Sequence, residues 1–379
     1  MGQVAVIGVG MTRFGKFPDR SVEDLGREAC WAAIQDAGID PRDIQAAFCG
    51  HIYQGSVAGQ RILAELGLTG IPIYNIENAC ASSSSGMELA CLGILSGQWD
   101  MVMALGAEKL YGKIHGAIAP DESDIEGDLG IVAPGFWAMR ARRHMHQYGT
   151  TAEQLAEVSV KNHRNGCLNP HAQYQKPVTV EEVLASRLIA DPLHLLDCCP
   201  IGDGAAAAIL VSDRVVRKYS AQPIWVAGIA FTTGSVESGA GDSTFEQLTD
   251  RAAKDAYARA GIGPEDVDVA EVHDCFTIAE IVRMESLGLC PRGEGGRWVA
   301  EGRTEIGGEI PINPSGGLLA KGHPVGATGI AQVAEIVWQL RGNAGDRQVE
   351  GATVGLTHNR GGIVGGTEGA ACCVTILKR

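Results

Sequence analysis

The chain of 379 residues lacks an excess of positive charge. Its net charge of −14 at pH 7 argues against nucleic acid or an anionic membrane as the main partner. It also lacks any run of about 18 apolar residues, so no membrane span is expected. The opening MGQVAVIGVG has no charged leader before a long apolar run, which argues against a secretory signal. The closing TILKR carries no peroxisomal tripeptide.

The eleven cysteines form no Cys-x-x-Cys pair, the spacing of common metal and redox motifs. Cys198 and Cys199 are adjacent, as are Cys372 and Cys373, which suits neither disulfides nor a metal cluster. We therefore predict reduced thiols in the cytoplasm, most of them buried as small apolar side chains.

Metal and dinucleotide motifs are also missing. His144 and His146 are a thin signal for zinc, and we predict that they lie on a solvated helix. The stretch GVGMTRFG at 8–15 has Arg13 where the third glycine of a dinucleotide-binding fingerprint belongs. No metal site and no tightly bound cofactor are therefore expected.

What the chain does have is an internal repeat. Residues 37–44 read AGIDPRDI and residues 260–267 read AGIGPEDV, each after an amphipathic helical pattern and before a short apolar segment. ACASSSSGMELACLGIL at 79–95 has a counterpart in GHPVGATGIAQVAEIVWQL at 322–340. Because two matches occur in the same order, we predict a duplicated fold.

Strands alternate with helices in both halves of this repeat. The expected helices include 22–36, 83–97 and 245–259, and the expected strands are 4–9, 46–49, 71–74, 101–105, 206–211, 224–229, 267–272, 353–356 and 371–377. This alternation predicts layered α/β packing. Residues of about 111–200 interrupt it without strong strands. They are expected to form an insertion that caps a pocket or makes an oligomer contact. The predicted domains are 1–220, including this insertion, and 221–379.

Four loops carry reactive side chains, and the first holds Cys80. Cys80 ends an apolar segment and stands just before a predicted helix. A helix N-terminus offers unpaired N–H groups and a partial positive charge, which lower the pKa of a thiol. The small residues at 81–85 leave room for a bulky substrate. The alternative is a buried structural cysteine with a serine cap.

The second loop is GGLLAKGHPVGATG at 316–329, in which five of the fourteen residues are glycine. His323 stands here between glycine and proline, at roughly the place that Cys80 holds in the first half. Matching loops of a duplicated fold can meet near its pseudo-twofold axis, and a histidine near a cysteine favours the thiolate. The alternative is an ordinary surface or core histidine.

The third loop is EVHDCFTIAEI at 271–281, in which His273, Asp274 and Cys275 follow an apolar strand. The carboxyl end of a strand is a common position for functional side chains in α/β folds. The alternative is plain packing, with the aspartate capping the next helix.

The fourth loop is GLTHNRGGIVGG at 355–366, where His358 and Asn359 precede four glycines. Glycine-rich turns bring backbone N–H groups close to a ligand oxygen, as an oxyanion hole requires. A simple hairpin turn is the competing interpretation.

Together with the opening VAVIGVGMTRFG, these loops resemble the thiolase superfamily over nearly the whole chain. HDCF at 273–276 stands where many thiolases carry Asn-Glu-Ala-Phe. It is similar to the motif of sterol-carrier-protein-type thiolases and their acetyl-CoA acetyltransferase relatives. The resemblance implies an α/β fold of five layers, αβαβα, built from two similar halves. It also implies a homodimer or tetramer and an inserted loop domain that helps to bind coenzyme A.

The resemblance also implies roles for single residues. Cys80 would be the nucleophile that takes an acyl group from acyl-CoA. His323 would help to activate Cys80 and hold the thioester oxygen, with His273 near the same oxygen. Cys275 would be the acid/base that moves a proton at the α-carbon or at the CoA sulfur.

A second oxyanion hole would use backbone N–H groups of the nucleophile and of Gly361 and Gly362. One departure from the family concerns the last loop, where many thiolases have a reactive Cys-x-Gly. Here His358 and Asn359 stand in that region. Cys275 fits the sterol-carrier-type solution to the same need, and His358 is the alternative acid/base.

The implied function is a thiolase-type acyltransferase that cleaves or forms 3-oxoacyl-CoA through an acyl-cysteine, with CoA as substrate or product. One alternative is a retro-aldol lyase acting on a CoA thioester with a small OB-fold partner, although such proteins tend to lack the nucleophilic cysteine. Others are an acyltransferase subunit with a non-CoA acceptor and a non-catalytic scaffold. Arg140, Arg142 and Arg143 are candidates for binding CoA, or else form a solvated face.

Overall fold

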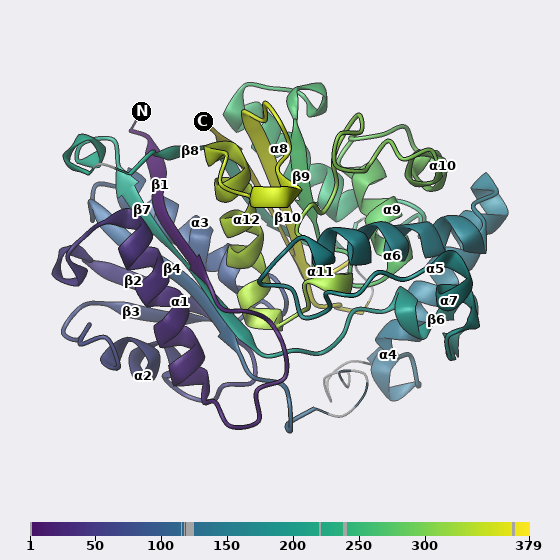
Figure 1. Cartoon of the computed structure of the whole chain (residues 1–379), viewed down its shortest axis with the longest axis horizontal. Coiled ribbons are helices and arrows are strands. Elements are labelled where there is room, and N and C mark those ends of the chain that lie inside the picture. The colour runs from purple at the N-terminus through teal and green to yellow at the C-terminus, as the bar shows by residue number, and fades with distance from the viewer. Residues whose placement is uncertain are drawn as a thin grey trace.

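The computed structural model describes residues 2–114, 116, 118, 125–219, 221–237, 241–365 and 368–379. The strands are β1 (Val4–Met11), β2 (Ala46–Gly50), β3 (Ile73–Ile76), β4 (Met101–Glu108), β5 (Leu188–Ala190), β6 (Leu193–His194), β7 (Gly204–Ser212), β8 (Ile224–Thr233), β9 (Val269–Val272), β10 (Val354–Gly361) and β11 (Ala371–Lys378). The α-helices are α1 (Val22–Ala37), α2 (Ala58–Ala64), α3 (Ser82–Leu95), α4 (Ile125–Asp128), α5 (Ala133–Tyr148), α6 (Ala152–Cys167), α7 (Val180–Ala185), α8 (Gln247–Ala260), α9 (Thr277–Ser286), α10 (Gly295–Ala300), α11 (Gly317–Ala320) and α12 (Thr328–Arg341). Figure 1 shows how they are arranged.

Nine strands form one mixed sheet in the order β3-β2-β4-β7-β1-β8-β11-β10-β9. The pairing in the first half repeats in the second. β2 runs parallel to β4 as β9 does to β10, and β7 lies antiparallel between β4 and β1 as β11 does between β10 and β8. The halves join where β1 meets β8, at Ala5–Trp225 and Val6–Ile224. The predicted duplication is therefore present in the sheet itself.

Helices cover both faces of each half. α1 packs on β1 and β7 of the first half, and α8 packs on β8 and β11 of the second. Between the halves lie α3 and α12, which contact each other and strands from both halves, so their apolar side chains share one buried cluster. This arrangement is the expected five-layered αβαβα packing, with each buried α or β surface covered by a neighbour.

The repeated AGI segment stops a helix in both halves. Gly38 after α1 and Gly261 after α8 adopt left-handed φ angles of 64° and 65°, and their N–H groups close the last helical turn. Glycine takes this conformation without a steric penalty, which is why it ends helices so often. Pro41 and Pro264 then begin short 3₁₀ turns that lead into β2 and β9.

Several strand boundaries differ from the prediction, among them those of β3 and β10. Instead of 71–74, β3 spans Ile73–Ile76, because its register with β2 begins at Ile73. Pro72 has no N–H to donate and only accepts a hydrogen bond from Ala47 N of β2. Instead of stopping at 356, β10 continues to Gly361 because it pairs with β11 over its whole length. The extra residues are polar but buried, so an apolar pattern could not reveal them.

The insertion of about 111–200 contributes α4 to α7 and the short pair β5–β6, and Figure 1 shows it beside the second half. His144 was predicted on a solvated helix, and this is wrong. Its side chain is fully buried, and its Nδ1 lies 2.7 Å from Thr150 Oγ1. The buried residues Trp137, Ala141 and His144 recur at helical spacing, so this face of α5 is turned inward. Within the described ranges, none of the helices has both the length and the apolar character needed to cross a bilayer.

Candidate active site

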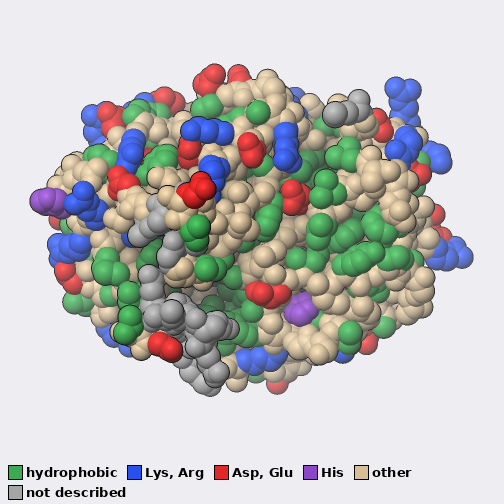
Figure 2. Space-filling model, turned by 180° about the vertical axis from the view of Figure 1, so that it is seen from behind, with side chains coloured by type: hydrophobic (Ala, Val, Ile, Leu, Met, Phe, Trp, Pro, Cys, Tyr) green, Lys and Arg blue, Asp and Glu red, His purple; other side chains and the backbone are tan. Residues whose placement is uncertain are grey.

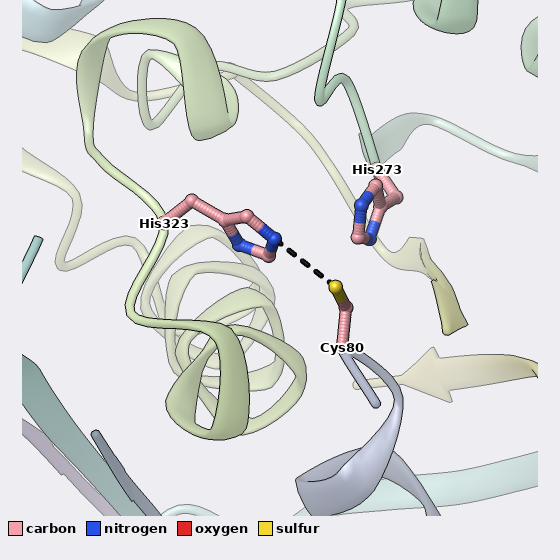
Figure 3. A group of neighbouring side chains, drawn as sticks. All are labelled: Cys80, His273 and His323. Atoms are coloured by element: carbon pink, nitrogen blue, oxygen red, sulfur yellow. Dashed lines mark hydrogen bonds between the residues drawn. The ribbon is translucent and has the colours of Figure 1, made fainter. Parts of the chain in front are cut away.

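Three loops bring Cys80, His273 and His323 together, as Figure 3 shows. Cys80 Sγ lies 3.3 Å from His323 Nε2, and the rings of His273 and His323 are 5.1 Å apart and nearly perpendicular. One side-chain donor atom from each of the three residues lies within 4.8 Å of the other two. Sulfur and imidazole nitrogen at this spacing could also ligate a soft metal such as zinc. No local ligand spacing in the sequence indicated a metal here, since each of the three residues lies on a different loop.

The backbone around Cys80 is tightly constrained. Ala79 adopts φ 47°, a left-handed conformation that non-glycine residues rarely take and that is common at functional sites. Across from it, a Cβ added to Gly361 would lie 2.0 Å from Asn78 O and 3.0 Å from Cys80 N. Only glycine fits there, so the end of β10 packs directly on the cysteine loop. Gly362 follows with φ 68°.

Thr328 orients His323. The Thr328 hydroxyl lies 3.0 Å from Pro324 O, to which it donates, and 2.7 Å from His323 Nδ1. Because a hydroxyl has one hydrogen, it then accepts a hydrogen bond from Nδ1–H. The other nitrogen, Nε2, is left with a free lone pair directed at the sulfur of Cys80. This is the tautomer that can accept the thiol proton.

Burial keeps the cysteine–histidine pair neutral in the resting site. Loss of hydration raises the pKa of the Cys80 thiol to about 12. Burial, together with the positive charges of Arg283 and Lys321, lowers the pKa of His323 to about 3. The expectation that the start of a helix lowers the pKa of Cys80 is therefore wrong. The N–H groups of Ala81 and of the next residue already donate to backbone carbonyls.

Cys275 lies beside a buried guanidinium. Its half-buried thiol is 3.6 Å from Nη1 of Arg283, which also donates to His273 O. Burial raises the pKa of Cys275, and the positive charge of Arg283 partly opposes this effect. The thiol is thus neutral but placed where a thiolate would be stabilised.

The middle residue of this loop has a structural role. Asp274 accepts hydrogen bonds from the N–H groups of Leu318 and Leu319, at 2.6 and 3.3 Å, and from Asn162 Nδ2 at 2.7 Å. A Cβ at Gly317 would collide with this carboxylate. Asp274 therefore caps α11 and ties the third loop to the second. Of its three predicted reactive residues, only His273 and Cys275 flank the site.

His358 and Asn359 are fully buried and make other contacts. His358 Nε2 lies 3.1 Å from the Thr249 hydroxyl, which donates to Glu246 Oε2 at 2.8 Å, so His358 is the donor to Thr249. Burial lowers the pKa of His358 to about 3. Asn359 Nδ2 donates to Gln332 at 3.1 Å. Gly361 is the last residue of β10, while Gly362 and Gly365 lie in the connection between β10 and β11, which do form a hairpin. Gly366 lies outside the described residues.

The arginines suggested for CoA binding separate into two kinds. Arg142 and Arg143 are exposed on α5, and Arg142 pairs with Asp191. Arg140 is buried, with its Nη1 2.8 Å from Glu246 Oε1. The solvated-face alternative is therefore wrong for Arg140.

Sequence reasoning missed a buried group that we call the guanidinium cluster, formed by Arg140, Arg283, Arg360 and Glu246. The Glu246 carboxylate lies 2.8 Å from Arg140, 3.2 Å from Arg283 and 3.6 Å from Arg360. The three arginines together hold the pKa of Glu246 well below its usual range. The members come from α5, α9, β10 and the start of α8, so no local motif could have indicated the cluster.

Glu108 was also missed. This fully buried carboxylate at the end of β4 accepts from the N–H groups of Ile52, Tyr53 and Gly326, at 3.0, 2.9 and 3.1 Å. It thereby ties the loop that carries His323 to the first half. The signal in the sequence that could have identified Glu108 is a single acidic residue at the end of an apolar strand.

Comparisons with known proteins identify the family of the chain. The family model "Thiolase, N-terminal domain" matches residues 4–214, and "Thiolase C-terminal domain-like" matches 231–378. The chain is 47% identical to acetyl-CoA acetyltransferase of Methanothermobacter thermautotrophicus over the full length of both. It is 42% identical to sterol carrier protein 2 of Bos taurus, covering 99% of this chain and 72% of that protein. Among solved structures, "Ltp2-ChsH2(DUF35) aldolase" superposes with a TM-score of 0.86 at 28% identity, covering 99% and 97% of the two chains.

The two family models together span almost the whole chain, and the relatives share its full length. The expected resemblance, fold and acyltransferase activity are confirmed. The chain belongs to the thiolase superfamily and is an acyltransferase of the thiolase type.

Proposed function

We propose that Cys80 is the nucleophile of a reaction that cleaves or forms a 3-oxoacyl-CoA through an acyl-cysteine intermediate. The observation that carries this proposal is the 3.3 Å contact of Cys80 Sγ with His323 Nε2, while Thr328 holds Nδ1. This pairing of a thiol with an oriented base is the usual arrangement of an activated nucleophile. CoA serves as substrate or product, and no tightly bound cofactor takes part.

In the cleavage direction, His323 Nε2 takes the thiol proton while Sγ bonds to the 3-keto carbon. The imidazolium and His273 lie beside the oxygen that becomes negative, where donors lower the barrier most. The bond between the α-carbon and the keto carbon then breaks. The Cys275 thiol gives its proton to the departing carbanion.

Transfer of the acyl group completes the cycle. The thiol of a second CoA gives its proton to the Cys275 thiolate and attacks the acyl-cysteine. As the carbon–sulfur bond to Cys80 breaks, the imidazolium of His323 returns the proton to the sulfur. All protons are thus restored, and the reverse sequence condenses two acyl-CoA molecules.

Two observations favour Cys275 over His358 as the acid/base. Cys275 is half-buried and touches the guanidinium of Arg283, which stabilises the thiolate that the cycle forms. His358 is fully buried and donates to Thr249, so its Nε2–H already has a partner. The N–H groups of Gly361 and Gly362 remain candidates for a second oxyanion hole, supported by the close packing of Gly361 on the cysteine loop.

The chain is proposed to act as a homodimer or tetramer. Leu89, Leu92 and Leu95 of α3 are exposed, and so is Tyr74 on the edge strand β3. Figure 2 shows apolar side chains gathered on this half of the molecule, seen from behind. An exposed apolar patch beside an unpaired strand edge favours association with a second copy.

We further propose domains at 1–220 and 221–379, CoA binding by the insertion of about 111–200, and a cytoplasmic location.

A second candidate is that acyl transfer requires a partner protein. The solved neighbour is described as an aldolase in which Ltp2 is joined with ChsH2(DUF35). By analogy, this chain would need a small OB-fold partner for full activity. Presence of Cys80 favours acyl transfer over the retro-aldol reaction in either case.

Thiolysis of acetoacetyl-CoA by free CoA tests the main proposal. The wild-type chain should produce acetyl-CoA, and Cys80→Ala should abolish the reaction. The exposed Cys167 offers a matched control, and Cys167→Ala should retain full activity. Turnover by Cys80→Ala at the wild-type rate would contradict the assignment. Activity that appears only after a partner is added would favour the second candidate.

A further inference from the structure

The guanidinium cluster carries an excess of buried positive charge. Arg140, Arg283 and Arg360 surround one carboxylate, that of Glu246. The next acidic group that contacts the cluster is Glu368, whose side chain is paired with Arg251 and which offers the cluster only its backbone oxygen. Among the described residues, the cluster therefore holds two positive charges without a matching anion.

Arg360 shows this excess most clearly. Its side chain is 4% exposed, yet its Nε has no hydrogen-bond partner among the described residues and lies 3.6 Å from Glu246. A buried charge without full pairing is costly, so such groups are retained where they meet a ligand. Guanidinium groups match a carboxylate especially well because their N–H groups form a planar fork.

The cluster adjoins the reacting groups. Arg283 donates to His273 O, and its Nη1 is 3.6 Å from Cys275 Sγ. The indole of Trp137 lies under Arg283 and Arg140, with ring centroids 4.8 and 5.1 Å from the guanidinium carbons. An acyl group held between the thiols of Cys80 and Cys275 therefore lies next to arginine side chains that pack on the indole of Trp137.

We propose that the guanidinium cluster binds a carboxylate at the acyl end of the substrate. The preferred substrates are then 3-oxoacyl-CoA thioesters of dicarboxylic acids rather than of simple fatty acids. This inference rests on the proposed function and names its substrate class. The anion is assigned to the acyl group, not to the phosphates of CoA, because Arg283 contacts Cys275 itself.

Binding to the inactive Cys80→Ala protein tests this proposal without turnover. The dissociation constants of succinyl-CoA and butyryl-CoA, two thioesters of equal acyl chain length, are measured by calorimetry. The carboxylated thioester should bind about 10- to 100-fold more tightly, as expected for a charge-assisted pair. Adding Arg360→Leu should remove most of this preference, and adding Arg360→Lys should retain part of it. The exposed Arg164, paired with Glu305, supplies the control variant Arg164→Leu, which should keep the preference.

Arg360 is the arginine replaced because Arg140 and Arg283 lie closer to Glu246 and still pair with it in the variant. Melting temperatures will show that the variants are folded. Equal affinity of Cys80→Ala for the two thioesters would overturn the proposal. So would an equal loss for both thioesters in Arg360→Leu, since that result would assign the cluster to the CoA phosphates. Failure of the proposed function is a separate result, namely no thiolysis of acetoacetyl-CoA by the wild-type chain.

Discussion

Replacing Thr328 by valine removes the group that fixes the tautomer of His323 while keeping the shape of the side chain. Both residues are buried, and the Nδ1 to Oγ1 distance is 2.7 Å. In the resting site this is a neutral hydrogen bond, worth about 0.5 to 1.5 kcal/mol net. When His323 takes the thiol proton, the bond becomes charge-assisted and contributes about 1.5 to 3 kcal/mol. The transition state thus loses about 1 to 2 kcal/mol more than the resting site, a rate decrease of about 5- to 30-fold.

The assay for Thr328→Val is the rate of Cys80 acetylation by acetyl-CoA, followed by rapid quenching and intact mass. The control is Thr304→Val, because Thr304 is equally buried but its hydroxyl has no hydrogen-bond partner among the described residues. Thr304→Val should acetylate at the wild-type rate, and Thr328→Ser should recover most of the loss. An unchanged rate in Thr328→Val would refute the proposed orientation of His323.

Three further predictions concern the reacting groups. Cys275→Ala should form acyl-Cys80 from acetyl-CoA more slowly than the wild-type chain, because Cys275 also gives its proton to the departing CoA sulfur. Condensation to acetoacetyl-CoA should fall by about 100-fold or more, because the group that takes the α-proton is missing; equal condensation rates would assign that role elsewhere. Since burial raises the pKa of Cys80 to about 12, the thiol stays protonated below that pH, and its alkylation by iodoacetamide without substrate should keep rising with pH up to pH 10. A rate plateau beginning below pH 8 would contradict this neutral resting state. Zinc should inhibit reversibly by binding Cys80, His273 and His323, whose donor atoms lie within 4.8 Å, and EDTA should restore activity; zinc-insensitive activity would argue against that geometry.

Much of the fold could be predicted because its signals are local. The repeated AGI segments predict the same helix stop, and Gly38 and Gly261 indeed take nearly identical left-handed conformations. The alternation of apolar strands and helices likewise predicts the layers. Boundaries were less accurate where pairing partners decide them, as in β10, whose buried polar end is held by β11. The burial of His144 was missed because it depends on Thr150 and Glu285 packing against α5.

The identity of the site residues could be predicted from the sequence better than their protonation state. Cys80 and His323 could be placed together because they occupy matching positions in the two repeats. Their neutral resting state could not be predicted, since it results from burial by distant parts of the chain. The guanidinium cluster was missed for the same reason. Its charges lie on four separate elements, and in the sequence Arg283 looks like an ordinary polar residue of α9.

Intact mass after mixing with acetyl-CoA tests the central claim most directly, that Cys80 carries the acyl group. The wild-type chain and Cys275→Ala should each gain the mass of one acetyl group, which peptide mapping should place on Cys80. Cys80→Ala should gain none. Acetylation that persists in Cys80→Ala, or that maps to Cys275 in the wild-type chain, would contradict the account.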